Sequence, residues 1–213
     1  MRIIAMSVLV GITGSIAAAE ARPELASPRN AARVYFQSLV RGDAAGARSA
    51  CVPDPKYDPL IDALAMVMNA SKKLSDAAIG KFGDAGKGFT GDLSRAEFVE
   101  QLDRAEVTID KDSATIRDPM GGPPMKLKLI DGNWKVDVPA SVNSKEDVKR
   151  GSAKLRTVAK IMDGMAGEIK ADKYTSADQA RQVFDSRVNA AMAMPSRPMR
   201  SPTTMPAPRR PNV

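Results

Sequence analysis

Residues 125–138, Met-Lys-Leu-Lys-Leu-Ile-Asp-Gly-Asn-Trp-Lys-Val-Asp-Val, decide the fold class of this chain. Apolar side chains alternate with polar ones on both sides of Asp131-Gly132, a dipeptide suited to a tight hairpin because both turn positions can adopt positive φ. Alternation with period two is typical of strands that have one face on a core and one in water. We therefore expect an antiparallel hairpin with Trp134 facing the core and Lys135 on the opposite face.

A second hairpin is predicted just before this one. Val107 and Ile109 alternate with polar residues, a turn follows at residues 110–113, and Ala114 and Ile116 resume the alternation. Together the two hairpins predict four antiparallel strands with one apolar face.

Local start and stop signals predict helices before the sheet. They are a helix from Ser27-Pro28 to Gly42, a short one capped by Asp43 and running through Cys51, a longer one from Asp58-Pro59, and one from the Ser94–Glu97 capping box to about Ala105. Five glycines between residues 80 and 91 predict a flexible loop before the last of these.

Two further helices are predicted after the sheet. The first begins at Ser144, and its apolar residues, spaced by three and four, form a narrow seam: Val148, Gly151, Leu155, Val158, Met162, Met165 and Ile169. The second follows Thr175, with Ser176 and Gln179 as a capping pair and an apolar stripe over residues 183–191. We favour packing of the seam on the rest of the domain or on this second helix, and homodimerisation is the alternative.

The first 21 residues have the order of a secretory signal peptide. Arg2 precedes an uncharged, mostly apolar run, and small residues surround two suitable cleavage points, after Ala19 and after Ala21. The run is shorter than the roughly 20 apolar residues of a membrane span. We therefore expect a secreted or periplasmic protein without a transmembrane anchor after cleavage.

The last segment, residues 195–213, is rich in proline and arginine and has no acidic residue. It supplies +4 of the formal net charge of +7, and its lack of apolar periodicity predicts disorder. The residues that could contact anionic surfaces are Arg197, Arg200, Arg209 and Arg210.

The whole pattern predicts the α+β class. The expected organisation is a signal peptide (residues 1–21), an α+β domain (22–140), a C-terminal helical extension (141–194) and a disordered tail (195–213). N-terminal helices precede the four-stranded antiparallel sheet, and a helical pair follows it.

Residue usage limits the chemistry. The chain contains no histidine, which excludes Ser-His-Asp and Cys-His nucleophile activation. A single cysteine, Cys51, allows neither an internal disulfide nor a usual zinc site, and we expect it to be a small buried apolar residue rather than a reactive thiol.

Two clusters of charged residues have a structural and a functional interpretation. Carboxylates lie around one helix start (Asp92, Glu97, Glu100 and Asp103), and lysines lie on the last hairpin (Lys126, Lys128 and Lys135). A catalytic carboxylate pair and a phosphate-binding sheet face are the functional interpretations. We favour solvated faces for both, and we assign no catalytic, cofactor-binding or metal-binding residue and no cofactor.

Part of the chain resembles the nuclear transport factor two-like superfamily. The resemblance rests on residues 31–45, where a long helix ends in Gly42-Asp43 before a short helix, and on the final Asp131-Gly132-Asn133-Trp134-Lys135-Val136. It covers about residues 27–139 and implies a cone-like α+β roll, a sheet wrapped around a helix that leaves a cavity. The enzymes of this superfamily rely largely on His/Asp pairs, so nothing catalytic carries over to a chain without histidine.

These observations lead us to expect an exported, non-catalytic binding or accessory domain for an unknown protein or small-molecule ligand, without specific nucleic-acid binding. One alternative is a histidine-free enzyme that uses carboxylates in the roll cavity. The other is a structural envelope protein that contacts anionic surface polymers through its tail. A buried carboxylate pair facing the cavity would favour the enzyme.

The order of residues 1–21 predicts removal of the signal peptide. Mass spectrometry of the protein isolated from its native source should find an N-terminus at Glu20 or at Arg22, because signal peptidase cuts after small residues. A mature protein that begins at Met1 would contradict export by this route.

Overall fold

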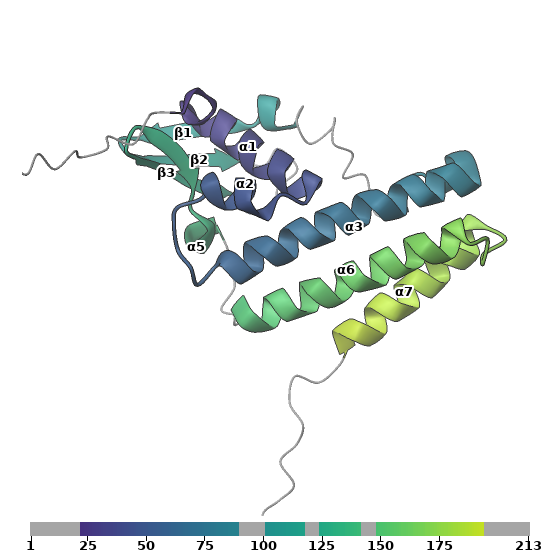
Figure 1. Cartoon of the computed structure of the whole chain (residues 1–213). Coiled ribbons are helices and arrows are strands. Elements are labelled where there is room, and N and C mark those ends of the chain that lie inside the picture. The colour runs from purple at the N-terminus through teal and green to yellow at the C-terminus, as the bar shows by residue number, and fades with distance from the viewer. Residues whose placement is uncertain (1–21, 90–100, 118–123, 142–147, 194–213) are drawn as a thin grey trace, which may run out of the picture.

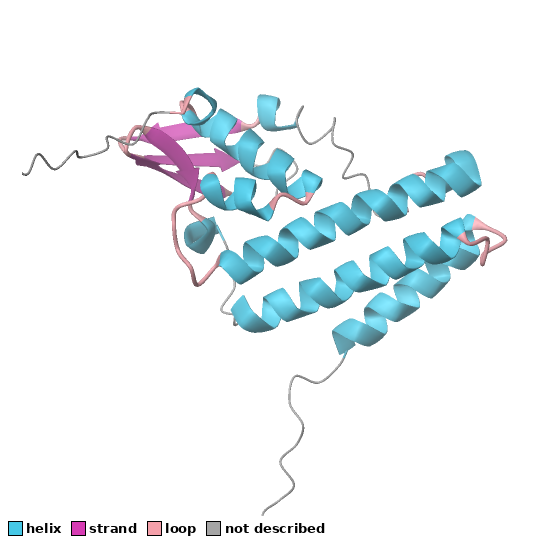
Figure 2. Cartoon of the chain, in the orientation of Figure 1, coloured by secondary structure: helices cyan, strands magenta, loops and turns pink. Residues whose placement is uncertain are grey.

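The structure is a computed structural model, which describes residues 22–89, 101–117, 124–141 and 148–193. The predicted α+β class is confirmed (Figure 1). Helices come first, a four-stranded antiparallel sheet follows, and two long helices end the described part of the chain. The sheet with its covering helices lies at one end of the molecule, and a layer of long helices extends from it (Figure 2).

The sheet has the simplest antiparallel order, β1-β2-β3-β4, with each strand beside its sequence neighbour. The strands are β1 (Glu106–Asp110), β2 (Ser113–Arg117), β3 (Met125–Ile130) and β4 (Asn133–Val136). Asp131 and Gly132 have φ of 49° and 74° in the β3–β4 turn, as the dipeptide predicts. The register pairs Leu129 with Trp134 and Lys128 with Lys135.

The apolar face of the sheet packs under helix α1 (Pro28–Arg41). The α1 helix begins at the Ser27 cap, whose hydroxyl accepts a hydrogen bond from the Asn30 amide, and ends at Gly42 with φ of 75°. Trp134 is only 7% exposed and belongs to the core with α1, as the alternation predicts. The opposite face carries the lysines.

The short helix α2 (Ala44–Ser49) ends before Cys51, so the prediction of a helix through Cys51 is wrong. Cys51 instead forms an isolated parallel bridge with Val136 of β4. The Val136 amide donates to the carbonyl of Ala50, and the Val52 amide donates to the carbonyl of Val136. The edge of β4 thus gives these backbone N–H and C=O groups hydrogen-bond partners, which a continued helix would otherwise have provided.

Helix α3 (Asp58–Phe82) is longer than the sequence predicts. It starts at the expected Asp58-Pro59 but continues through Gly80, where a loop is expected, and the 3-10 helix η2 (Gly83–Gly86) follows. Leu74, Ala77 and Ala78 are buried near its end. This tertiary burial stabilises helix in a segment whose glycine content disfavours it.

Two clusters of buried apolar side chains share α3. Its first half, with Ile61 and Ala65, joins α1, α2 and the sheet in one cluster. Its second half joins α6 (Val148–Lys170) and α7 (Ala177–Ala193) in another. The α3 helix therefore connects the two parts of the molecule.

Helices α3 and α6 make the most extensive contact between elements, and they run parallel. The ion pairs Lys73–Asp163 and Lys81–Asp172 join positions 90 and 91 residues apart along the chain. At nearly the same offset, small buried residues recur every seven positions on each helix: Ala63, Ala70 and Ala77 on α3, and Ser152, Ala159 and Ala166 on α6. Small side chains at such positions allow two helix backbones to approach closely.

The seam predicted on α6 is therefore partly wrong. Met165 and Ile169 are buried as expected, but Val148, Gly151, Leu155, Val158 and Met162 are only half-buried. The line that faces α3 consists of alanine and serine, which a search for large apolar residues does not select. Packing on both α3 and α7 agrees with the favoured alternative for this helix.

Helix α7 returns antiparallel to α6 (Figure 1), and its Arg187 contacts Glu168 near the end of α6. The Ser176 hydroxyl accepts a hydrogen bond from the Gln179 amide at 3.2 Å, which confirms half of the predicted capping pair. The Gln179 side chain accepts from the Thr175 amide rather than from that of Ser176. A short helix that the sequence does not predict, α5 (Val138–Ser141), follows β4.

Several predictions fall outside the described residues: the signal peptide, the Ser94–Glu97 capping box, the start of a helix at Ser144, and the tail. Only residues 101–104 of the helix expected to end near Ala105 are described, and they are helical. No helix in the described ranges is long and apolar enough to cross a membrane.

The close contact of α3 and α6 predicts sensitivity to side-chain volume. Ala159→Leu should lower the free energy of unfolding by about 1–3 kcal/mol. The larger side chain must either push the two helices apart or adopt an unfavourable rotamer. Ala153 is exposed on the same helix, so Ala153→Leu is the matched control and should change stability by less than about 0.5 kcal/mol. Urea unfolding measures both, and equal effects would contradict the small-residue contact.

Candidate functional site

The three hairpin lysines all have partners within the chain. Lys126 donates from Nζ to the Thr115 hydroxyl at 3.1 Å, and Lys135 donates from Nζ to the Ser49 carbonyl at 3.2 Å. Lys128 forms an ion pair with Asp137 at 2.8 Å. The structure brings the lysines together on one sheet face, as predicted, and gives each a structural contact.

Among the described residues, Asp137 is the acidic residue with a buried side chain. Its side chain is 6% exposed, and besides Lys128 it accepts a hydrogen bond from the Ala140 amide at 3.1 Å. This bond caps the start of α5. A buried carboxylate that is paired and caps a helix has its oxygens occupied, and it has no second buried carboxylate beside it in the described chain.

Cys51 is buried, as the sequence predicts, with 2% exposure. Its thiol donates to the Ala47 carbonyl at 3.2 Å. Burial raises the pKa of the thiol to about 12, against a smaller opposing effect of Lys135. Because the thiolate is the reactive form, this cysteine is a poor nucleophile at neutral pH.

The predicted carboxylate cluster can be followed at one residue. Asp103 forms an ion pair with Arg33 of α1, and both side chains are partly exposed. Asp92, Glu97 and Glu100 lie outside the described residues. The Asp103 contact agrees with a solvated face, and it adds a link between α1 and the segment before β1.

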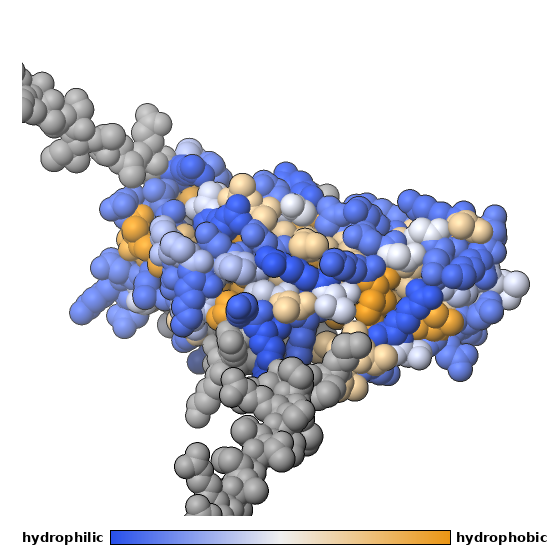
Figure 3. Space-filling view, turned by 60° about the horizontal axis from the view of Figure 1, so that its bottom comes forward, coloured by the Kyte–Doolittle hydropathy of each residue, from blue (hydrophilic) through white to orange (hydrophobic). Residues whose placement is uncertain are grey.

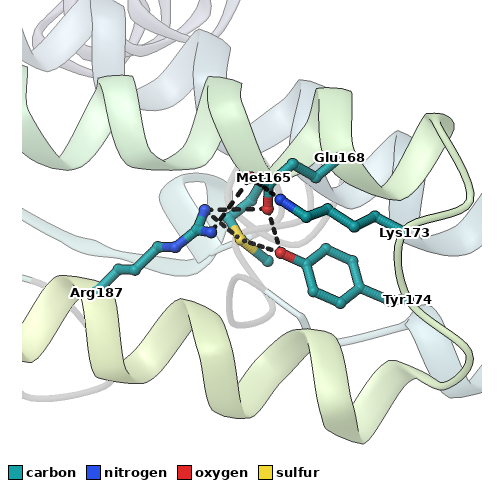
Figure 4. Close-up of polar contacts among 5 residues, drawn as sticks. All are labelled: Met165, Glu168, Lys173, Tyr174 and Arg187. Carbon is teal, nitrogen blue, oxygen red and sulfur yellow. Dashed lines mark hydrogen bonds and ion pairs between the residues drawn. The ribbon is translucent and has the colours of Figure 1, made fainter.

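Among the described residues, the densest polar cluster lies where α6 connects to α7, and the sequence analysis did not single it out. We call it the Glu168 cluster: Met165, Glu168, Lys173, Tyr174 and Arg187 (Figure 4). Lys173 Nζ donates to Glu168 Oε1 at 2.9 Å, and the Tyr174 hydroxyl donates to Oε2. Arg187 holds both carboxylate oxygens, with Nη2 3.2 Å from Oε1 and Nη1 3.1 Å from Oε2.

Local structure brings these groups together. Glu168 is on the last turn of α6, Lys173 and Tyr174 are in the connection, and Arg187 reaches across from α7. Asp172 takes a φ of 59° in the connection, which turns the chain sharply after α6. Met165 Sδ lies 3.4 Å from the Tyr174 hydroxyl and 3.3 Å from Arg187 Nη1, so the apolar core begins directly beneath.

The electrostatics of the cluster favour one protonation state. Hydrogen bonds from Tyr174, Lys173 and Arg187 lower the pKa of Glu168 from 4.5 to about 2. Burial, together with the hydrogen bond to Glu168, raises the pKa of Tyr174. The hydrogen bond to Glu168 also raises the pKa of Arg187. At neutral pH the cluster is therefore a carboxylate, a neutral phenol and two cations.

This arrangement suits a structural role better than acid–base catalysis. A general acid or base works best with a pKa near the working pH, and both Glu168 and Tyr174 are shifted away from it. The carboxylate already accepts from three side chains. The cluster therefore joins α6, the connection and α7 into one unit.

Sequence alone contained a weak signal for the cluster. The predicted helical hairpin implies that residues near its turn are close in space, and Glu168, Lys173 and Tyr174 are all within six residues of that turn. Arg187, however, lies 19 residues from Glu168, and only the crossing of α7 over α6 shows that it reaches the carboxylate.

No protein-family model, curated protein or solved structure matches this chain. Within the described ranges, no group of three or more cysteine, aspartate or glutamate side chains could hold a metal ion.

The lowered pKa of Glu168 predicts a pH-dependent contribution to stability. Glu168→Gln should lower the free energy of unfolding at pH 7 by about 1–2 kcal/mol, because charge-assisted hydrogen bonds are lost. The pKa is about 2 in the folded protein and near 4.5 when unfolded, so this contribution is complete above pH 4.5 and is lost as the pH falls toward 2. The difference between the wild type and the variant should shrink in that window.

Glu106 is an exposed control, because the one ion pair that it forms among the described residues, with Arg117, is long at 3.7 Å. Glu106→Gln should leave the unfolding free energy nearly unchanged between pH 7 and pH 3. A Glu168→Gln variant as stable as the Glu106→Gln variant at pH 7 would show that the cluster does not hold α7.

Proposed function

We propose that this chain is an exported, non-catalytic binding or accessory protein. The proposal rests on the observation that the groups best suited to catalysis already have structural roles. Cys51, Asp137 and Glu168 are each paired or packed within the described structure. The histidine-free composition supports the same conclusion. The order of residues 1–21 supports export.

The alternative of a carboxylate enzyme has less support. It needs two carboxylates that share one site and have separated pKa values. In the described structure the buried carboxylate Asp137 faces Lys128, and Glu168 is surrounded by donors. Neither carboxylate has a carboxylate partner.

We also propose that residues 27–139 form an α+β roll related to the nuclear transport factor two-like superfamily. The support is the element order and the packing of α1 on one face of an antiparallel sheet. Tyr35 and Leu39 of α1 and Leu127 of β3 are buried together in this region. Because these side chains fill the space under α1, we propose that the outer surface of the helical layer, rather than the roll interior, contacts the partner.

Fractionation of the native source tests this function. The mature protein should be recovered mainly with the cell envelope at low salt, because a binding protein is retained by its partner. Variants Cys51→Ala and Glu168→Gln should be retained equally, since both residues serve the fold. Their melting temperatures, measured in parallel, show whether each variant is folded under the assay conditions.

Two results would contradict the proposal. One is recovery of the wild-type protein entirely in the soluble fraction at low salt. The other is loss of retention in a variant that remains folded, which would assign that side chain a direct part in the chemistry with its partner.

A further inference from the structure

The two edges of the sheet differ in what covers them. At the β4 edge the chain after α2 is hydrogen-bonded to the strand: the Val136 amide donates to the Ala50 carbonyl at 2.8 Å, and the Val52 amide donates to the Val136 carbonyl at 2.9 Å. Strand β1 forms the other edge, and among the described residues it pairs with β2 alone. An uncovered edge presents backbone N–H and C=O groups that another chain can pair with.

The strand register shows which backbone groups of β1 face outward. The Asp112 carbonyl accepts from the Leu129 amide of β3, so the residue after Asp112 turns its backbone groups toward its partner in β1, Asp110. Bonded and unbonded positions alternate along an antiparallel pair, so Val107 and Ile109 direct their N–H and C=O groups away from β2. In the part of the chain that the structure describes, no other segment is bonded to these outward groups.

The apolar side of β1 is also open to solvent. The Ile109 side chain is 55% exposed, the largest value among the exposed large apolar side chains of the described residues. Helix α1 makes its main contacts with the sheet at β2 and β4. By contrast, the face of the molecule seen from below is mostly hydrophilic (Figure 3). The β1 edge therefore combines an exposed apolar side chain with unpaired backbone groups.

The charges of β1 decide which strand fits beside it. Alternation places Glu106, Thr108 and Asp110 on the polar face, so two acids border the edge, and the strand contains no cation. Glu106 has a long contact of 3.7 Å with Arg117, and Asp110 forms no ion pair within the described ranges. Basic side chains opposite these acids would form favourable cross-strand pairs.

A second copy of this chain fits the edge poorly. Two-fold pairing of β1 with β1 about Thr108 would use all the outward backbone groups, but it places Glu106 opposite Asp110 of the second copy at both ends. Like charges directly opposite each other destabilise a strand pair. The basic segment of the chain itself, residues 195–213, is rich in proline, which lacks the N–H that a paired strand donates. The edge therefore suits a strand from another protein.

We infer that the free edge of β1 binds an extended segment of a second protein in which basic and apolar side chains alternate. In antiparallel pairing, the apolar residues of the segment lie opposite Val107 and Ile109 and exchange backbone hydrogen bonds with them. Its basic residues then lie opposite Glu106 and Asp110. This edge belongs to the sheet and is separate from the helical layer to which we assign the partner, so it is a second binding surface beyond the proposed function.

Binding of the peptide Lys-Val-Lys-Val-Lys, blocked at both ends, to the purified mature protein tests the inference. Amide hydrogen exchange measured by NMR should slow at least about fivefold at Val107 and Ile109 in the complex, because these amides gain acceptors. Exchange at Thr108, whose amide already faces β2, should change little. A peptide with glutamate in place of each lysine should bind at least about tenfold more weakly at low salt.

Two matched controls separate backbone pairing from charge attraction. A lysine peptide with both valine amides N-methylated keeps its charge but loses the backbone donors, and it should bind at least about tenfold more weakly. In the protein, Glu106→Gln combined with Asp110→Asn should weaken binding of the lysine peptide by about five- to tenfold. The control, Asp84→Asn combined with Asp178→Asn, removes the same charge at side chains that are 91% and 95% exposed, and it should change binding by less than about twofold.

Four results would overturn the inference. Three are absence of binding of the lysine peptide, equal binding of its N-methylated form, and equal weakening in the two protein variants, whose melting temperatures show that they are folded. The fourth is slow exchange at Val107 and Ile109 without peptide that depends on protein concentration, because the occupant is then a second copy. If the lysine peptide does not bind but the protein is still retained by the cell envelope, this edge is wrong and the proposed function stands.

Discussion

Helices α3 and α6 touch through alanine and serine, and the rest of the structure depends on this contact. Three small residues on each helix, seven positions apart, are buried at matching levels. Close approach brings many atoms of the two backbones into van der Waals contact, which compensates for the small apolar area of each side chain. The contact extends along much of both helices, and α3 continues through Gly80, where the sequence predicts a loop.

A long α3 joins two hydrophobic clusters that would otherwise be separate. The first cluster includes Trp134 and is closed by α1, while the second includes Met165 and Phe184. Neither is large, and a small core rarely supplies much stability alone. Because one helix lines both, loss of α3 packing in one cluster removes support from the other. The Glu168 cluster has a related role, since it fastens α7 to α6 at the second core.

The parts of the fold that sequence predicts are those with local causes. The Asp131-Gly132 turn, the Ser27 cap and the burial of Trp134 follow from backbone conformation and from alternation, and all are confirmed. The errors have tertiary causes. Cys51 leaves its helix to pair with β4, and Gly80 stays helical because its helix packs on α6. Among the site residues, Arg187 meets Glu168 only through the crossing of two helices, which no local pattern contains.

The charged residues in the two halves of α6 have different surroundings. In the second half, Asp163 pairs with Lys73 of α3 and Glu168 pairs with Arg187 of α7, so charges of opposite sign fasten the helix to its neighbours. In the first half, charges of one sign accumulate on the solvent side, where repulsion between them opposes helix formation. Such a segment would be a poor helix by itself. It remains helical because Ser152 and Ala159 are buried against α3 on its other side. The small-residue contact thus stabilises the helix that carries these charges of one sign.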